Sequence, residues 1–148
     1  MLNISTATDV NEVLPMCEAF HYESGLDEFF SYNEKTMIST VNALIKTGGI
    51  FIARHENKPV GMIAGIIYPH YTNADHITGQ EMFWYVSPKH RGGNAGRGLL
   101  DSLQEWAVRN GAKSFMMISL ESIQPEKVGK FYMKNGYSLL EHSYIRRL

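Results

Sequence analysis

Apolar and polar positions in this chain follow two repeats, one typical of strands and one typical of helices. Leu2–Ala7 predicts a short first strand. Asp9 and Glu12 then have the spacing of a capping box, which predicts a helix start. The apolar residues of this helix recur every three or four positions: Val10, Val13, Leu14, Cys17 and Phe20. A second amphipathic helix is predicted after Asn33, and Gly48-Gly49 ends it.

The middle of the chain predicts β-structure. Runs rich in β-branched and aromatic residues cover Ile50–Arg54, Val60–Tyr68 and Thr78–Val86. Their order along the chain predicts an antiparallel meander. Lys58-Pro59 is expected at the first turn, and the polar stretch from Pro69 to Gly79 is expected to be a loop.

The second half of the chain alternates between helices and strands. A third helix is predicted after a glycine-rich turn and stops at Asn110-Gly111. Ser114–Leu120 is apolar throughout, which indicates a strand in the centre of a sheet. Pro125 suits the first turn of a fourth helix. Strands at Tyr137–Leu140 and Ser143–Arg147 then complete the pattern.

These elements predict an α/β (α+β) fold with one mixed sheet. The expected order is β-α-α-β-β-β-α-β-α-β-β, which gives seven strands flanked by about four helices. A length of 148 residues predicts one domain over residues 1–148.

Composition and charge exclude several classes of protein. The chain is 44% apolar and 20% charged, which is typical of a soluble globular protein. No run approaches the ~20 apolar residues of a membrane span, and the first residues do not resemble a signal peptide. A net charge of -1 argues against nucleic-acid binding. The six histidines are scattered, so no metal site is expected.

The single cysteine, Cys17, cannot form an internal disulfide. This favours a reducing, cytoplasmic location. Because Cys17 lies on the apolar face of its helix, a buried structural thiol is favoured over a nucleophile.

The segment VSPKHRGGNAGRGLL, from Val86 to Leu100, has the properties of an anion-binding turn. Its small residues allow backbone N–H groups to approach a ligand, and the helix that follows adds partial positive charge. Arg91 and Arg97 can add charge-assisted hydrogen bonds to phosphate oxygens. The spacing of the glycines matches neither GxxxxGK[ST] nor GxGxxG.

Two motifs resemble those of the GNAT superfamily of acyl-CoA-dependent N-acetyltransferases. The pattern V-x-P-x-x-R-G-x-x-x-G before a leucine-rich helix is similar to motif A, except that Asn94 replaces a small residue. KFYMKNGYSLLE, residues 130–141, is similar to motif B. Pro125 replaces an asparagine that is frequent before this second motif.

This resemblance implies that acetyl-CoA lies along the strand that ends at Val86. Its diphosphate would occupy the glycine-rich turn, and its pantetheine arm would fill a gap where this strand splays from Ser114–Leu120. Such a gap leaves backbone groups unpaired until a ligand binds. The implied cofactor-binding residues are Tyr85, Val86, Ser87, Arg91, Gly92, Gly93, Asn94, Ala95, Gly96 and Arg97.

The resemblance also implies direct attack of an amine on the thioester. A primary amine, with a pKa near ~10.4, is protonated at pH 7 and needs a proton acceptor. Tyr132 of the second motif is the expected general acid that protonates the leaving thiol. Glu81 is the candidate base, although a solvent-facing carboxylate at a strand end explains it equally well. Glu121 is a further candidate.

The acceptor amine is expected to bind beside the loop that joins the first two helices. Carboxylates there can attract a cation, and the expected acceptor-binding residues are Glu23, Asp27, Glu28 and Phe29. Ordinary surface charge and anchoring of the loop by its aromatic residues are the alternatives. The acceptor would be the amine of a small molecule or a protein, and edge pairing at the C-terminal strands would favour a homodimer.

Two other functions stay open at this stage. One is a catalytically idle member of the same superfamily that binds CoA or a partner protein, which the departures at Asn94 and Pro125 allow. The other is a nucleic-acid-binding module, which the net charge disfavours.

Overall fold

The computed structural model covers all 148 residues and contains one five-stranded sheet. The strands lie in chain order and are β1 (Leu2–Thr6), β2 (Ile50–His55), β3 (Lys58–His70), β4 (Asn73–Val86) and β5 (Ser114–Met116). The pairs from β1 to β4 are antiparallel, whereas β4 and β5 are parallel. The sheet is therefore mixed, as the sequence predicts.

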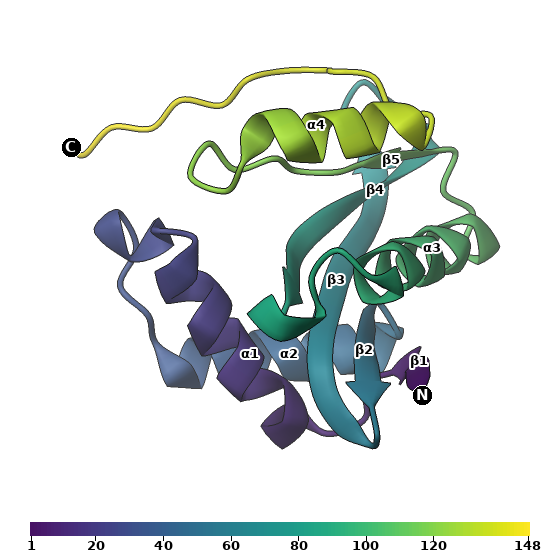
Figure 1. The fold of residues 1–148 in the computed structure, drawn as a ribbon. Helices are drawn as coiled ribbons and strands as arrows, with labels where there is room; N and C mark the ends of the chain where they lie inside the picture. The colour runs from purple at the N-terminus through teal and green to yellow at the C-terminus, as the bar shows by residue number, and fades with distance from the viewer.

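Four α-helices surround the sheet (Figure 1). They are α1 (Val10–Glu23), α2 (Glu34–Thr47), α3 (Asn94–Arg109) and α4 (Pro125–Lys134), with short 3₁₀ helices at Leu26–Glu28 (η1) and Pro88–His90 (η2). Helices α1 and α2 share one apolar core with the sheet, and α3 shares a second core on its other face. None of these helices combines the length and apolar character that a bilayer crossing requires.

Both predicted helix caps form, although the capping box does not. The Asp9 side chain accepts a hydrogen bond from the Asn11 N–H, and Asn33 accepts one from Thr36. Glu12 instead accepts two hydrogen bonds from Arg54 of β2, because that guanidinium offers a paired geometry that a single backbone N–H cannot. Cys17 is buried as predicted, and burial raises the pKa of its thiol to about 12.

The predicted turn at Lys58-Pro59 and the predicted loop from Pro69 to Gly79 are both wrong. The β2–β3 turn consists of Glu56 and Asn57, whose φ angles of 50° and 65° suit a tight two-residue hairpin. Strands β3 and β4 pair from Gly61 with Val86 to His70 with Asn73, so the polar stretch is the extended end of a hairpin. Polar composition misled the prediction because this end of the hairpin is exposed rather than irregular.

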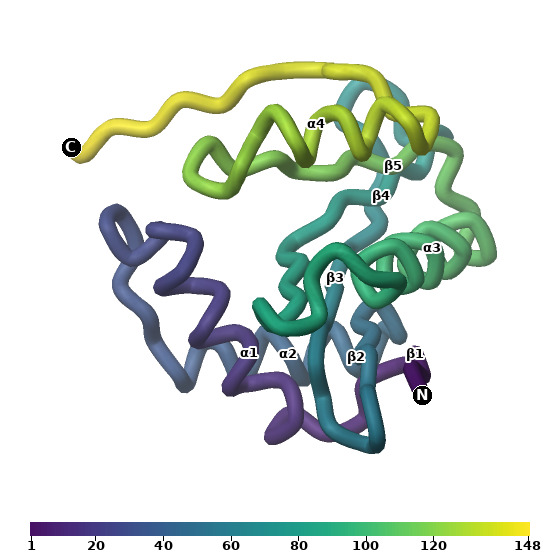
Figure 2. Tube along the Cα trace, viewed as in Figure 1, coloured from purple at the N-terminus to yellow at the C-terminus, as the bar shows by residue number.

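The count of seven strands is also wrong, although the fold class and the order of elements through α4 are confirmed. Strand β5 ends at Met116 instead of Leu120 and lies at the sheet edge, not in its centre. Residues 137–148 form no strand and pass over α4 towards the α1 side of the molecule (Figure 2). Leu139, Leu140 and Tyr144 are each at least 74% exposed, so no apolar burial stabilises strand pairing there.

Candidate active site

The sheet opens between β4 and β5. The two strands pair only where Thr78, Gly79 and Gln80 lie opposite residues 114–116. At the next position β4 has a bulge, because Phe83 pairs with Ala64 while Glu81 pairs with Gly65. A bulge bends its strand, and from Glu81 to Val86 β4 has only β3 as a strand neighbour. The splay that the resemblance implies is present.

Glu81 lies at the point where the strands separate, and it is only 4% exposed. The alternative of a carboxylate facing solvent is therefore wrong. Burial raises the pKa of Glu81 to about 8, and a hydrogen bond from the Ile118 backbone opposes this shift. A group with this pKa can change its protonation state near neutral pH, as a general base must.

Tyr132 of α4 reaches the same place. Its side chain is buried, and its hydroxyl donates a 2.6 Å hydrogen bond to the Ile118 carbonyl. Burial, followed by the negative charges of Glu81 and Tyr137, raises the pKa of this phenol. Ile118 thus holds both candidate catalytic residues through its backbone, in the segment that leaves the sheet after β5.

Two aromatic residues that received no role in the sequence analysis complete this site. Tyr137 donates a 2.7 Å hydrogen bond to the Gln104 side chain of α3, and burial raises its pKa to about 12. The Trp84 ring stacks on Tyr132 at a centroid distance of 6.2 Å, and its buried Nε1 has no hydrogen-bond partner. The signal for Trp84 was its place in β4, two positions before the strand ends at Val86.

The glycine-rich turn leaves the first turn of α3 without a cap. Gly92 has a φ of 80°, which only glycine adopts easily, and Gly93 precedes the helix without offering a side chain. Helices α1 and α2 each have a side-chain cap and an acidic residue in their first turn, but α3 has neither. Its first N–H groups are therefore available to an anion.

The predicted cofactor residues within α3 differ in what they can contribute. Asn94 is the first helical residue and has no positive φ, so the departure from the family pattern does not strain the turn. Ala95 is buried in the core and can offer only its N–H. Gly96 lies beneath the Trp84 ring, and a Cβ there would be 3.3 Å from that ring. Arg97 is exposed and 3.7 Å from Asp101.

The predicted cofactor residues at the end of β4 already make some hydrogen bonds and contacts within the protein. The Ser87 N–H donates to the Val60 carbonyl at 2.8 Å. The Val86 carbonyl accepts a 2.7 Å hydrogen bond from Arg91 Nε, and the Arg91 guanidinium lies 5.6 Å from the centre of the Tyr85 ring. Arg91 Nη2 is also 2.5 Å from Glu23 Oε1, which joins a predicted cofactor residue to a predicted acceptor residue.

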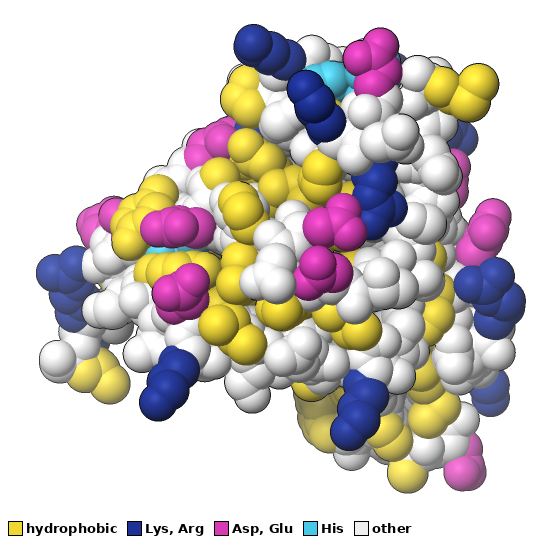
Figure 3. Space-filling model, turned by 90° about the horizontal axis from the view of Figure 1, so that it is seen from below, with side chains coloured by type: hydrophobic (Ala, Val, Ile, Leu, Met, Phe, Trp, Pro, Cys, Tyr) yellow, Lys and Arg dark blue, Asp and Glu magenta, His cyan; other side chains and the backbone are white.

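The other predicted acceptor residues lie in or beside η1. Asp27 and Glu28 are exposed, and Phe29 is 38% exposed. Arg147 near the C-terminus places its guanidinium 5.7 Å from the centre of the Phe29 ring and donates to the Glu28 carbonyl. The Phe29 face can thus contact a cation. Seen from below, the molecule shows apolar side chains with both carboxylates and basic side chains around them (Figure 3).

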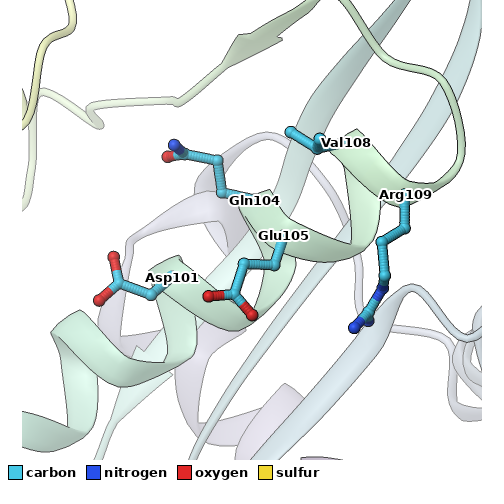
Figure 4. A pocket seen from close by; sticks show the side chains of 5 residues that line it. All are labelled: Asp101, Gln104, Glu105, Val108 and Arg109. Carbon is cyan, nitrogen blue, oxygen red and sulfur yellow. The ribbon is translucent and has the colours of Figure 1, made fainter.

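Two surface hollows lie elsewhere. One, of about 450 Å³, is on the outer face of α3, where five side chains surround it (Figure 4). The other, of about 270 Å³, lies between the end of α3 and the end of α4. Neither of these two hollows contains Glu81 or the glycine-rich turn.

Comparisons with known proteins agree with this geometry. The model of the acetyltransferase (GNAT) family matches residues 11–137. No curated protein sequence matches the chain. Among solved structures, a ribosomal-protein-alanine N-acetyltransferase from Brucella melitensis biovar Abortus 2308 superimposes with a TM-score of 0.71 at 20% identity, over 100% of this chain and 99% of the other.

Two further structures have the same fold. An aminoglycoside acetyltransferase from an uncultured soil metagenomic sample has a TM-score of 0.74 at 14% identity, over 99% of this chain and 97% of its own. A predicted acetyltransferase from Clostridium acetobutylicum, with acetyl-CoA, has a TM-score of 0.69 at 21% identity. The match covers 99% of this chain and 96% of the other.

Proposed function

Because this chain belongs to the acetyltransferase (GNAT) family, we propose that it transfers an acetyl group from acetyl-CoA to a primary amine of a small molecule or protein. The observation that carries this proposal is the meeting of Glu81 and Tyr132 at the Ile118 backbone. They meet where β4 separates from β5, on the strand that leads into the uncapped start of α3.

The residues of the chain fit acetyl-CoA. The free N–H groups at the start of α3, together with Arg97, can bind a diphosphate. The side of β4 that lacks a strand partner can bind the amide groups of pantetheine. When bound there, acetyl-CoA supplies a thioester carbonyl for attack by the amine.

Glu81 accepts the proton of the incoming amine. An ordinary carboxyl has a pKa about 6 units below that of an ammonium group, whereas a pKa of about 8 reduces this difference to about 2 units. The environment of Glu81 therefore makes it a stronger base than an exposed glutamate, and its position in the opening places it beside the reacting atoms.

Tyr132 donates a hydrogen bond to the leaving sulfur. Its raised pKa keeps the phenol protonated throughout the neutral range. The hydroxyl leaves the Ile118 carbonyl and turns to the sulfur as the thiolate forms. A donor is most useful there because a thiolate, unlike the thioester, carries a full negative charge.

The acceptor approaches from the η1 side, where Asp27 and Glu28 can attract a cationic amine and where this amine would replace the Arg147 guanidinium at the Phe29 ring. The names of two structural relatives refer to ribosomal-protein alanine and to aminoglycosides, both of which provide amines. A panel of acceptors should therefore include peptide N-termini and aminoglycosides as well as polyamines and amino acids.

Release of free CoA thiol from acetyl-CoA, measured across this panel, tests the proposal. Tyr132→Phe should lower kcat about 100-fold with acetyl-CoA affinity retained, because only the proton donor is lost. Tyr68→Phe is the matched control, since Tyr68 also donates a side-chain hydrogen bond, to Gln80, and it has no place in the proposed mechanism.

Binding of acetyl-CoA without thiol release from any amine would favour the catalytically idle alternative. Tyr132→Phe would then change nothing that the assay measures. Absence of acetyl-CoA binding would exclude acetyl transfer and an idle CoA-binding role, and would leave only the binding of a partner protein.

A further inference from the structure

Arg91 is held by three partners that belong to two different parts of the site. Its Nε donates to the Val86 carbonyl at 2.7 Å, and its guanidinium lies 5.6 Å from the centre of the Tyr85 ring. Its Nη2 is 2.5 Å from Glu23, the last residue of α1. In Figure 2 the turn between β4 and α3 lies beside α1, as this contact requires.

Glu23 needs a cation at this position. The C-terminal end of a helix carries partial negative charge, so a carboxylate in its last turn is unfavourable unless a positive group compensates. The basic residue in the last turn of α1 is His21, which is engaged with the Phe30 carbonyl through Nε2. Arg91 therefore provides the compensating charge for Glu23 from outside the helix.

The residue after Glu23 is held from the opposite side. Ser122, in the segment between β5 and α4, donates a 2.5 Å hydrogen bond to the Ser24 carbonyl. The pair Glu23-Ser24 thus links the turn that leads into α3 to the segment that leads into the helix of Tyr132. Gly25 follows with a φ of 75°, and the chain turns there into η1.

We propose that Arg91 is a positioning residue for the acceptor segment rather than a ligand of the diphosphate. Two of its three guanidinium nitrogens are already engaged with Val86 and Glu23, which leaves the diphosphate to the N–H groups of α3 and to Arg97. By fixing Glu23, Arg91 fixes the point where the chain enters η1. This inference rests on the proposed function, because it assigns η1 to acceptor binding.

The test compares Arg91→Gln, Glu23→Gln and the double variant. Each single variant should raise the acceptor KM about five-fold, because an ion pair with both side chains partly exposed is worth up to about 1 kcal/mol. The double variant should be no worse than either single one, because both substitutions break the same contact. The affinity for acetyl-CoA, measured by calorimetry, should change less than about two-fold.

Arg97→Gln is the matched control, since it removes an arginine from the same anion-binding region without touching α1. It should weaken acetyl-CoA binding and leave the acceptor KM unchanged. The inference is overturned if Arg91→Gln weakens acetyl-CoA binding as Arg97→Gln does while Glu23→Gln has no effect on either constant.

Hydrogen exchange gives a readout that does not need catalysis. Both single variants should speed amide exchange in residues 24–30, and Arg97→Gln should not. Unchanged exchange in both variants overturns the inference even if the enzyme is active. Faster exchange in a protein that releases no thiol would support the contact and contradict only the proposed function.

Discussion

Glu81 is a buried carboxyl in the opening between β4 and β5, and its protonation should govern the pH dependence of catalysis. A base works only when deprotonated, so kcat/KM should rise with pH and level off above a pKa of about 8. A series of kcat/KM values from pH 6 to 9.5 measures this rise. Glu81→Gln should remove it, whereas Glu105→Gln, at an exposed position on α3, should leave it in place.

The same residue should give stability a pH dependence of known sign. The folded protein holds the Glu81 proton up to a pH of about 8, whereas the unfolded chain releases it near 4.5. Between these values the native state binds more protons, so the free energy of unfolding decreases as pH rises. Denaturant unfolding at pH 5 and at pH 8 should show a smaller difference for Glu81→Gln than for the natural chain.

Among the elements, α3 begins without a side-chain cap or an acidic residue in its first turn. This leaves its N–H groups free for an anion but makes the helix less stable than a capped one. Asn94→Asp places a carboxylate in the first turn, where the helix dipole favours negative charge by about 0.3–1 kcal/mol. The variant should be more stable in thermal unfolding yet bind acetyl-CoA more weakly, because the carboxylate repels the diphosphate. Asn94→Ala, which adds no charge, separates the two effects. A stabilised variant with unchanged acetyl-CoA affinity would show that the diphosphate binds elsewhere.

Strand β5 is attached to the sheet by three residues, so a small change in β4 should release it. A Cβ at Gly79 would overlap the Phe115 ring of β5. Gly79→Ala should therefore cost about 1–3 kcal/mol in urea unfolding and lower kcat as well, because β5 leads to Ile118. Gly129→Ala in α4 is the contrasting variant. Nothing lies near its Cβ, and alanine should stabilise the helix by about 0.5–1 kcal/mol.

The elements that the sequence predicts well are those whose signals are local. Asp9 and Asn33 as caps, and Gly48 at the end of α2, each act within one turn of their own helix. The tight turn at Glu56-Asn57 was missed because neither residue is a glycine, although asparagine tolerates a positive φ. The length of β5 was missed because apolar composition does not show where a strand leaves its partner.

Only those parts of the candidate site that lie within one continuous segment could be predicted from the sequence. The glycine-rich turn and Tyr132 belong to continuous motifs, whereas the contact between Arg91 and Glu23 joins residues far apart in the chain. Glu81 likewise lies near Tyr132 of α4, which follows it at a distance in sequence. Such features arise from packing, and no periodicity in the sequence records them.

At the scale of the whole molecule, the sheet separates two layers and the site lies where they meet. The acceptor segment belongs to the α1–α2 layer, and the start of α3 belongs to the other. Helix α4 packs Phe131 against the core on the α3 side, and the Tyr132–Ile118 hydrogen bond and the stack of Trp84 on Tyr132 also hold it. A ligand that fills the opening between β4 and β5 would add contacts where the protein has few of its own.

Acetyl-CoA should therefore stabilise the protein unevenly. Binding only to the native state raises the free energy of unfolding by about 2.7 kcal/mol at 100 times the Kd, which thermal unfolding would detect. Hydrogen exchange should slow most in α4, because its amides open locally more easily than those of the core strands. ADP, which supplies a diphosphate without pantetheine, should protect the first turn of α3 and leave α4 unprotected. Equal protection of α4 by ADP and by acetyl-CoA would mean that the pantetheine arm does not occupy the opening between β4 and β5.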